Sequence, residues 1–156
     1  MLTQVASRSY LFPVRPDAND QALGQLLDRA AIHDVLLRYA RGVDRRDLDL
    51  VAACFTPDAA YEGSLAHGTI ADALAALRVA VTRYTSTLHF LGNQVIELDG
   101  DAARSETYAL AHHLLPDGTL RIVAVRYLDE LVRQNGGWFI RRRVAQREWE
   151  RTEPGR

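Results

Sequence analysis

The second half of this 156-residue sequence repeats its apolar residues with a period of two, whereas the first half repeats them every three or four residues. Four long segments after residue 86 are rich in β-branched, aromatic and leucine residues. They are separated by Asp99-Gly100, Asp117-Gly118 and Gly136-Gly137, dipeptides that favour the tight turns of antiparallel hairpins. The pattern therefore predicts a meander of four strands, over residues 87–98, 102–115, 120–132 and 138–149.

The first half predicts three helices. Apolar residues recur at helical spacing from Asp20, and we expect this long helix to end between Gly42 and Arg46. Asp47 suits the N-cap of a short second helix, because its side chain can accept a hydrogen bond from a free backbone N–H. A third amphipathic pattern begins at residues 68–69.

These elements predict the fold class and the domain organisation. A short strand is expected over residues 59–62, and strands joined by hairpins form an antiparallel sheet. We therefore expect an α+β fold, in which a cone-shaped, curved antiparallel sheet packs on three N-terminal helices around a small apolar pocket. The length suits one domain, over residues 20–150, with an N-terminal arm over 1–19 and a C-terminal tail over 151–156.

The charge balance excludes several classes of function. All 19 basic residues are arginine, against 20 acidic residues, which gives a formal net charge of -1 and argues against a nucleic-acid partner. The absence of lysine excludes a Schiff-base lysine and a P-loop lysine. No apolar run approaches the ~18 residues of a membrane span, and no signal-peptide pattern occurs. We therefore expect a cytoplasmic protein with no membrane partner.

Asp44 and His89 form a candidate acid–base pair. Asp44 lies at the end of the first predicted helix, where it suits a general base, an orienting partner for a histidine, or a capping charge. His89 lies in a strand that is otherwise apolar on both faces, as a catalytic or a core histidine does. A buried imidazole needs a partner for at least one nitrogen, and a carboxylate from the helix end can supply it.

Strand alternation sends the adjacent residues His112 and His113 to opposite faces of the sheet. Tyr108, Leu110 and His112 share one face, and their side chains are bulkier than most of those on the other face. We expect this bulkier set to line the pocket and His113 to face outward.

Two further contacts with a substrate are expected. Phe55 is expected to face inward from the end of the short helix, and Arg141 to reach a substrate oxygen at the cavity mouth, although the run Arg141–Arg143 is also typical of a solvated strand face. His89, His112 and Asp44 are a conceivable ligand set for iron or zinc, but no HExxH or HxH pairing supports it. We expect neither a metal nor a cofactor, since no phosphate-binding glycine motif is present.

Several segments resemble, in their order and spacing, the SnoaL-like branch of the nuclear transport factor 2-like superfamily. The resemblance covers about residues 20–150 and implies a cone of curved antiparallel sheet closed by helices. The segments that carry it are Asp28–Asp47, Phe55–Ala59, Thr87–Asn93, Leu98–Tyr108, Tyr127–Asp129 and Gly137–Ile140.

The resemblance implies roles for particular residues. Dehydratase-like members of the superfamily pair an Asp at the end of the first helix with a His on a strand, and the matching positions are Asp44 and His89. A tyrosine that precedes this Asp by five residues is matched by Tyr39. Scytalone dehydratase adds a second histidine and another tyrosine, matched by His112 and Tyr61.

The function implied by the resemblance is that of a cofactor-independent lyase or isomerase. Such a dehydratase, isomerase or cyclase would use an Asp–His general base on a hydrophobic cyclic substrate such as a polyketide, steroid or terpenoid. Two alternatives stay open, a small-molecule binding protein without turnover and a structural subunit of the same fold. Relatives often form dimers or trimers through the sheet, so a homodimer or homotrimer is expected.

Overall fold

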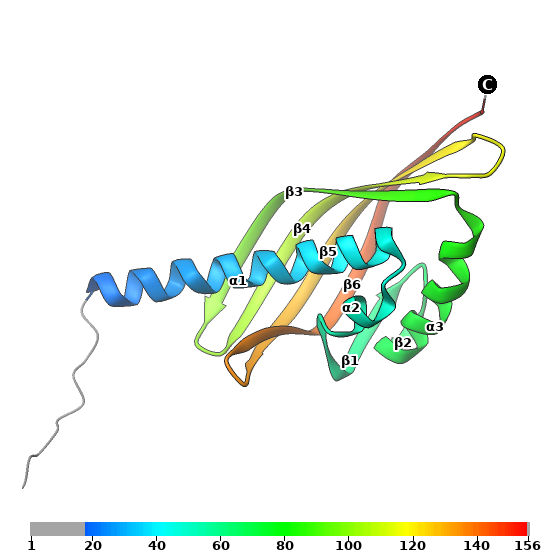
Figure 1. The fold of residues 1–156 in the computed structure, drawn as a ribbon. Coiled ribbons are helices and arrows are strands. Elements are labelled where there is room, and N and C mark those ends of the chain that lie inside the picture. Colours follow the sequence, from blue (N-terminus) through cyan, green and yellow to red (C-terminus); the bar gives the residue numbers. More distant parts are fainter. Residues whose placement is uncertain (1–17, 156) are drawn as a thin grey trace, which may run out of the picture.

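The computed structural model describes residues 18–155, in which a long helix lies across one face of a strongly curved sheet (Figure 1). The helices are α1 (Ala18–Arg45), α2 (Leu48–Ala52) and α3 (Ile70–Ala80), which continues into one 3₁₀ turn (Val81–Arg83). The strands are β1 (Phe55–Gly63), β2 (His67–Thr69), β3 (Ser86–Asp99), β4 (Ala102–Leu114), β5 (Leu120–Gln134) and β6 (Gly137–Glu153). Helices on one face of a curved, open sheet confirm the predicted α+β class.

The sheet has six strands in the order β2-β1-β6-β5-β4-β3. Consecutive hairpins join β3 to β6, as the turn dipeptides predict. The expected all-antiparallel sheet is wrong at one place, since β1 runs parallel to β6. This pairing escaped prediction because no short turn encodes it: the chain passes through α3 and four further strands between β1 and β6. The short strand β2 pairs antiparallel with β1 at the other edge of the sheet.

The terminal helix and strand extend beyond the expected domain boundaries. Most of the expected N-terminal arm lies outside the described residues, and α1 begins at Ala18. At the other end β6 continues to Glu153, so residues 151–153 of the expected tail belong to the sheet. Within residues 18–155, the helices lack the length of apolar sequence that crossing a bilayer requires.

The end of α1 is fixed by tight packing against α2. A side chain at Gly42 would place its Cβ 2.8 Å from Cγ2 of Val51, so only glycine permits this approach of the two helices. The helix ends at Arg45, and the next residue, Arg46, has a left-handed φ of 58°. Together these features fix the last turn of α1, which carries Asp44, against α2.

The core lies between α1 and the inner face of the sheet. Small residues on β4 leave room for the helix on this face. The buried residues of α1 form one stripe, which packs with apolar side chains of β1, β5 and β6. The members of this core include Ile32, Val35, Leu36, Tyr39, Val43, Phe55, Leu131, Trp138 and Ile140.

The N-cap of α2 provides a test of this local structure. Asp47 accepts a hydrogen bond from the backbone N–H of Leu50 at 2.9 Å, as its predicted capping role requires. Asp47→Ala should lower the free energy of unfolding by about 1 kcal/mol, which corresponds to a fall in Tm of about 2–4 °C for a chain of this size. Asp47→Asn keeps an acceptor and should retain most of the stability. Equal losses for the two variants in urea unfolding would contradict the capping role.

Candidate active site

Asp44 and His89 meet at the junction of α1 and β3. Asp44 Oδ1 lies 2.7 Å from His89 Nδ1 and accepts a second hydrogen bond, at 2.9 Å, from the Thr87 hydroxyl. Asp44 Oδ2 accepts the backbone N–H of His89 at 2.8 Å. The expected contact between the two side chains is therefore present, and one carboxylate fixes both the backbone and the ring of His89.

This arrangement sets the tautomer of His89. Burial disfavours the charge of Asp44, but the hydrogen bonds from the His89 side chain and backbone and from Thr87 outweigh it, so the pKa of Asp44 lies below its ordinary value. The ionised carboxylate can only accept hydrogen bonds, so His89 donates from Nδ1. A neutral His89 then has a lone pair on Nε2, the nitrogen that is free to accept a proton.

His89 lines a cavity of about 130 Å³, whereas Asp44 is not among its lining residues. Tyr39 and Tyr61, both expected at the site, are buried among its lining residues. Burial raises the pKa of Tyr61, and the neighbouring Tyr39 adds to this effect, so the Tyr61 phenol stays protonated. Other lining residues that bear on the chemistry are Tyr84, Thr87, His113, Arg121, Tyr127 and Arg147.

His113, and not His112, faces this cavity, so the predicted orientation of the two histidines is wrong. His113 lies opposite Thr87 in the β3–β4 register, and its ring centroid is 6.0 Å from that of His89. Burial, with the charges of His89 and Arg121 nearby, lowers the pKa of His113 to about 4. His113 is therefore neutral at physiological pH.

Side-chain size does not predict which face of β4 is inward, because the bulkier face is the outer one. Tyr108, Leu110 and His112 lie on the outer face, on the side of Leu88 and Phe90, which are 60% and 65% exposed. The inner face of β4 carries mostly small residues, and those from Ala103 to Ala111 are buried. Tyr108 and Leu110 therefore do not line the cavity, contrary to expectation.

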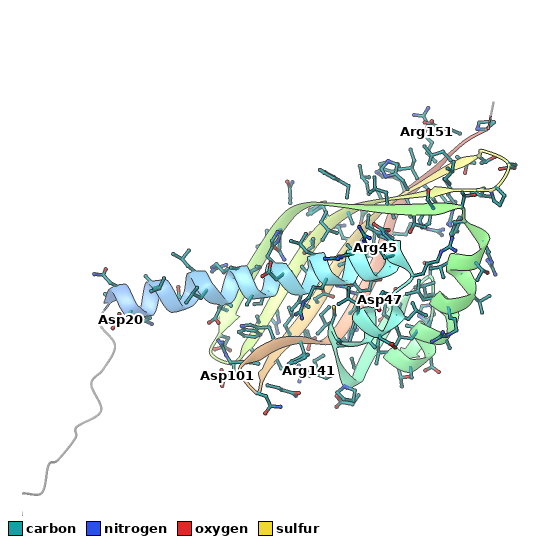
Figure 2. The ribbon with its side chains drawn as sticks, in the orientation of Figure 1. Asp20, Arg45, Asp47, Asp101, Arg141 and Arg151 are labelled. Carbon is teal, nitrogen blue, oxygen red and sulfur yellow. The ribbon has the colours of Figure 1, made fainter. Side chains whose placement is uncertain are left out.

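Phe55 and Arg141 are also displaced from their expected positions. Phe55 begins β1 and is buried beneath Tyr39, with the two rings 5.9 Å apart, but it does not reach the cavity. Arg141 is exposed and pairs with Glu130 at 2.6 Å. Figure 2 shows Arg141 and Arg151 at opposite ends of β6, and the cavity is lined from a part of β6 between them, at Ala145 and Arg147.

The arginine that turns inward is Arg143. The β5–β6 register shifts between Glu130 and Leu131, which leaves Arg141 as an extra residue in a bulge. Beyond the bulge the alternation of faces is shifted by one residue. Ile140 and Arg143, which are three residues apart, therefore both lie on the inner face and are buried. No simple sequence signal marks this bulge, and alternation alone sends Arg143 outward.

Arg143 forms a fully buried ion pair behind the cavity. Its guanidinium donates two hydrogen bonds to Asp129, at 2.7 and 2.8 Å, and neither side chain is accessible to solvent. The same group lies 4.1 Å from the Tyr39 ring and 4.3 Å from the Tyr127 ring, within the range of cation–π attraction. Two tyrosines of the cavity wall are thereby held by one buried cation.

The conceivable metal set of His89, His112 and Asp44 is not assembled, since His112 lies on the other face of the sheet from His89. Across residues 18–155, no cluster of three His, Cys, Asp or Glu side chains suits a metal ion.

The Arg143–Asp129 pair yields a prediction about stability. Removing one partner of a buried ion pair leaves an uncompensated charge, so Asp129→Ala should lower the free energy of unfolding by about 3–5 kcal/mol. The double variant Asp129→Leu with Arg143→Met removes both charges and should recover much of this loss. Urea unfolding of the three proteins measures the difference. A double variant as unstable as Asp129→Ala would show that packing, and not the charge, is responsible.

Comparison with known proteins confirms the resemblance seen in the sequence. The profile of the SnoaL-like domain family matches residues 24–144. An uncharacterized protein of Mycobacterium tuberculosis is 28% identical over 134 residues, which cover 82% of this chain and 90% of the relative.

Two solved structures have a similar fold. A protein from Kribbella flavida superposes with a TM-score of 0.74 at 25% identity, covering 81% of this chain and 95% of that one. The hexachlorocyclohexane dehydrochlorinase LinA-type3 from Novosphingobium barchaimii superposes with a TM-score of 0.75 at 22% identity, covering 85% of this chain and 94% of that one. Both share the curved sheet and helices described above.

Proposed function

Because this chain belongs to the SnoaL-like domain family, we propose that it is a cofactor-independent lyase or isomerase that removes a proton from a small cyclic substrate. His89 is the general base and Asp44 orients it. The dehydrochlorinase among the structural neighbours is a protein of the same fold whose name denotes an elimination reaction, which fits this class of chemistry.

The observation that carries the proposal is the set of three hydrogen bonds accepted by Asp44. A carboxylate bound in this way cannot rotate, so it directs Nε2 of His89 away from α1 and stabilises the imidazolium that forms on proton transfer. A histidine with only a structural role needs a hydrogen-bond partner, but it does not need to line a cavity. His89 lines one.

The reaction begins when Nε2 of His89 takes a proton from an acidified carbon of the substrate. The electron pair of the broken C–H bond then forms a new double bond, either by expelling a leaving group or by moving charge onto a carbonyl oxygen. Tyr39 and Tyr61 carry phenol groups suited to donate a hydrogen bond to that oxygen or leaving group. In this proposal His113 takes the place expected for His112, as a neutral group beside the reacting atoms.

The size of the cavity narrows the substrate class. A cavity of about 130 Å³ is close to the ~150 Å³ that holds one benzene ring. We propose that a single ring is enclosed next to His89, while any further part of a polyketide, steroid or terpenoid projects through the mouth.

The general base is tested with single-ring hydroxy, keto and halogenated compounds incubated in D₂O, with elimination and deuterium exchange followed by NMR. On any compound turned over, His89→Gln should lower kcat/KM by about 10²–10⁴-fold, the usual contribution of a positioned base. Asp44→Asn should be similarly harmful, because an amide does not stabilise the imidazolium.

His113→Gln and His112→Gln form a matched pair of controls, since the residues are adjacent but face opposite ways. The first should reduce turnover and the second should leave it near the wild-type rate. Full activity in a folded His89→Gln protein would exclude the mechanism. Specific binding of a compound with no turnover would favour the alternative of a binding protein.

We also propose that the outer face of the sheet joins two or more copies of this chain. Leu88, Phe90, Val95 and Trp149 are 51–65% exposed, and Phe90 and Trp149 line the same shallow groove on this face. Exposed apolar patches of this kind mark interaction sites. The nearby charges are already paired, since Arg126 contacts Glu148 at 2.7 Å and Glu106 at 3.3 Å. A face that is apolar and locally neutral suits a second copy of itself better than a highly charged partner.

Light scattering after size exclusion tests this association. Phe90→Glu places a charge within the proposed interface and should convert an oligomer into monomers. Val79→Glu changes an equally exposed residue on α3 and should leave the mass unchanged. A wild-type protein that is monomeric at high micromolar concentration would contradict the proposal.

A further inference from the structure

A second polar group lies at the cavity wall, away from Asp44. Tyr84 follows the 3₁₀ turn after α3, and its hydroxyl accepts a hydrogen bond from Nη1 of Arg121 at 3.0 Å. Both residues line the cavity.

Arg121 is held in place by a charged cluster on β6. It makes two hydrogen bonds to Glu150, at 2.6 and 2.8 Å, and Glu150 also accepts one from Arg147 at 3.0 Å. A shift in the β5–β6 register between Ala124 and Val125 makes this possible, because it lets Arg147 and Glu150 share the inner face. Such a bulge re-aims side chains, and here it builds a support for one guanidinium.

Tyr84 itself is fixed from two other directions. Its backbone carbonyl accepts a hydrogen bond from Arg46 at 2.7 Å, and its ring packs on His113 with centroids 4.6 Å apart. His113 in turn contacts His89. The three rings therefore form a continuous line along the cavity wall, with the proposed base at one end and the Tyr84 phenol at the other.

The hydrogen bonding of Tyr84 leaves one proton unused. A phenol has one donor and two acceptor positions, and Arg121 can only donate. Arg121 therefore occupies an acceptor position of Tyr84, whose own proton is donated to no residue among 18–155. An oriented donor facing a cavity is the arrangement that recognises an oxygen atom of a ligand.

We infer that Tyr84 is the substrate-binding residue that donates a hydrogen bond to an oxygen of the substrate, and that Arg121 is its positioning residue. The ligand class is a single ring bearing a hydroxyl or carbonyl oxygen on the side remote from His89. The inference deepens the proposed function and rests on it for the orientation of the substrate, but the recognition of oxygen can be measured without turnover.

Phenol and toluene provide the test, because they have nearly the same size and differ by a hydroxyl in place of a methyl group. Dissociation constants for the full-length protein are measured by ligand-observed NMR. One hydrogen bond should make phenol bind about three- to tenfold more tightly than toluene. Tyr84→Phe should abolish this preference and leave the affinity for toluene unchanged. Arg121→Met should reduce the preference, because Tyr84 loses its anchor.

Tyr108→Phe is the matched control, since it removes the same hydroxyl from the outer face of the sheet and should preserve the preference. Equal affinities for the two compounds, no saturable binding of either, or a preference that survives in Tyr84→Phe would each overturn the inference. The phenol preference of His89→Gln, compared with turnover by the wild type, distinguishes failure of this inference from failure of the proposed function. If this variant keeps the preference for phenol while the wild type turns over no compound, the inference stands and the proposed function fails.

Discussion

The carboxylate of Asp44 joins the end of α1 to the free edge of the sheet, and the site depends on this contact. β3 is an edge strand, so the N–H of His89 that points away from β4 has no strand to pair with. Asp44 accepts that N–H together with the His89 ring and the Thr87 hydroxyl. One side chain thus satisfies the sheet edge and orients the proposed base, so the requirements of folding and of chemistry coincide at this residue.

The opposite wall is shaped by interruptions of β6. A regular strand would place every second residue on the inner face, but the bulges at Arg141 and near Glu148 change the alternation twice. The first turns Arg143 inward, where Asp129 and the Tyr39 and Tyr127 rings surround it. The second assembles the cluster that holds Arg121. The polar groups of this wall therefore depend on the two register shifts. Burying the charges of Arg143 and Asp129 there costs desolvation free energy.

The sequence predicted what local rules determine. Turn dipeptides located the hairpins and Asp47 marked a helix start. The need of a buried imidazole for a partner made Asp44 a candidate for His89, and the family resemblance paired the two. Prediction from the sequence failed where contacts between distant segments determine which face of a strand is inward. The inward face of β4 is set by the packing of the whole sheet, and small residues such as Ala109 and Ala111 lie inside with His113. The inward turn of Arg143 depends on a bulge that alternation does not foresee.

The three rings along the cavity wall place a neutral group between two charged regions. When His89 accepts a proton it becomes a cation beside Asp44, while Arg121 is a permanent cation on the far side of His113. A charged His113 would oppose both, because like charges at such distances disfavour each other inside a protein. Since burial and these neighbours hold the pKa of His113 at about 4, the ring stays uncharged at neutral pH. A neutral His113 therefore adds no like charge beside the protonated base or beside Arg121.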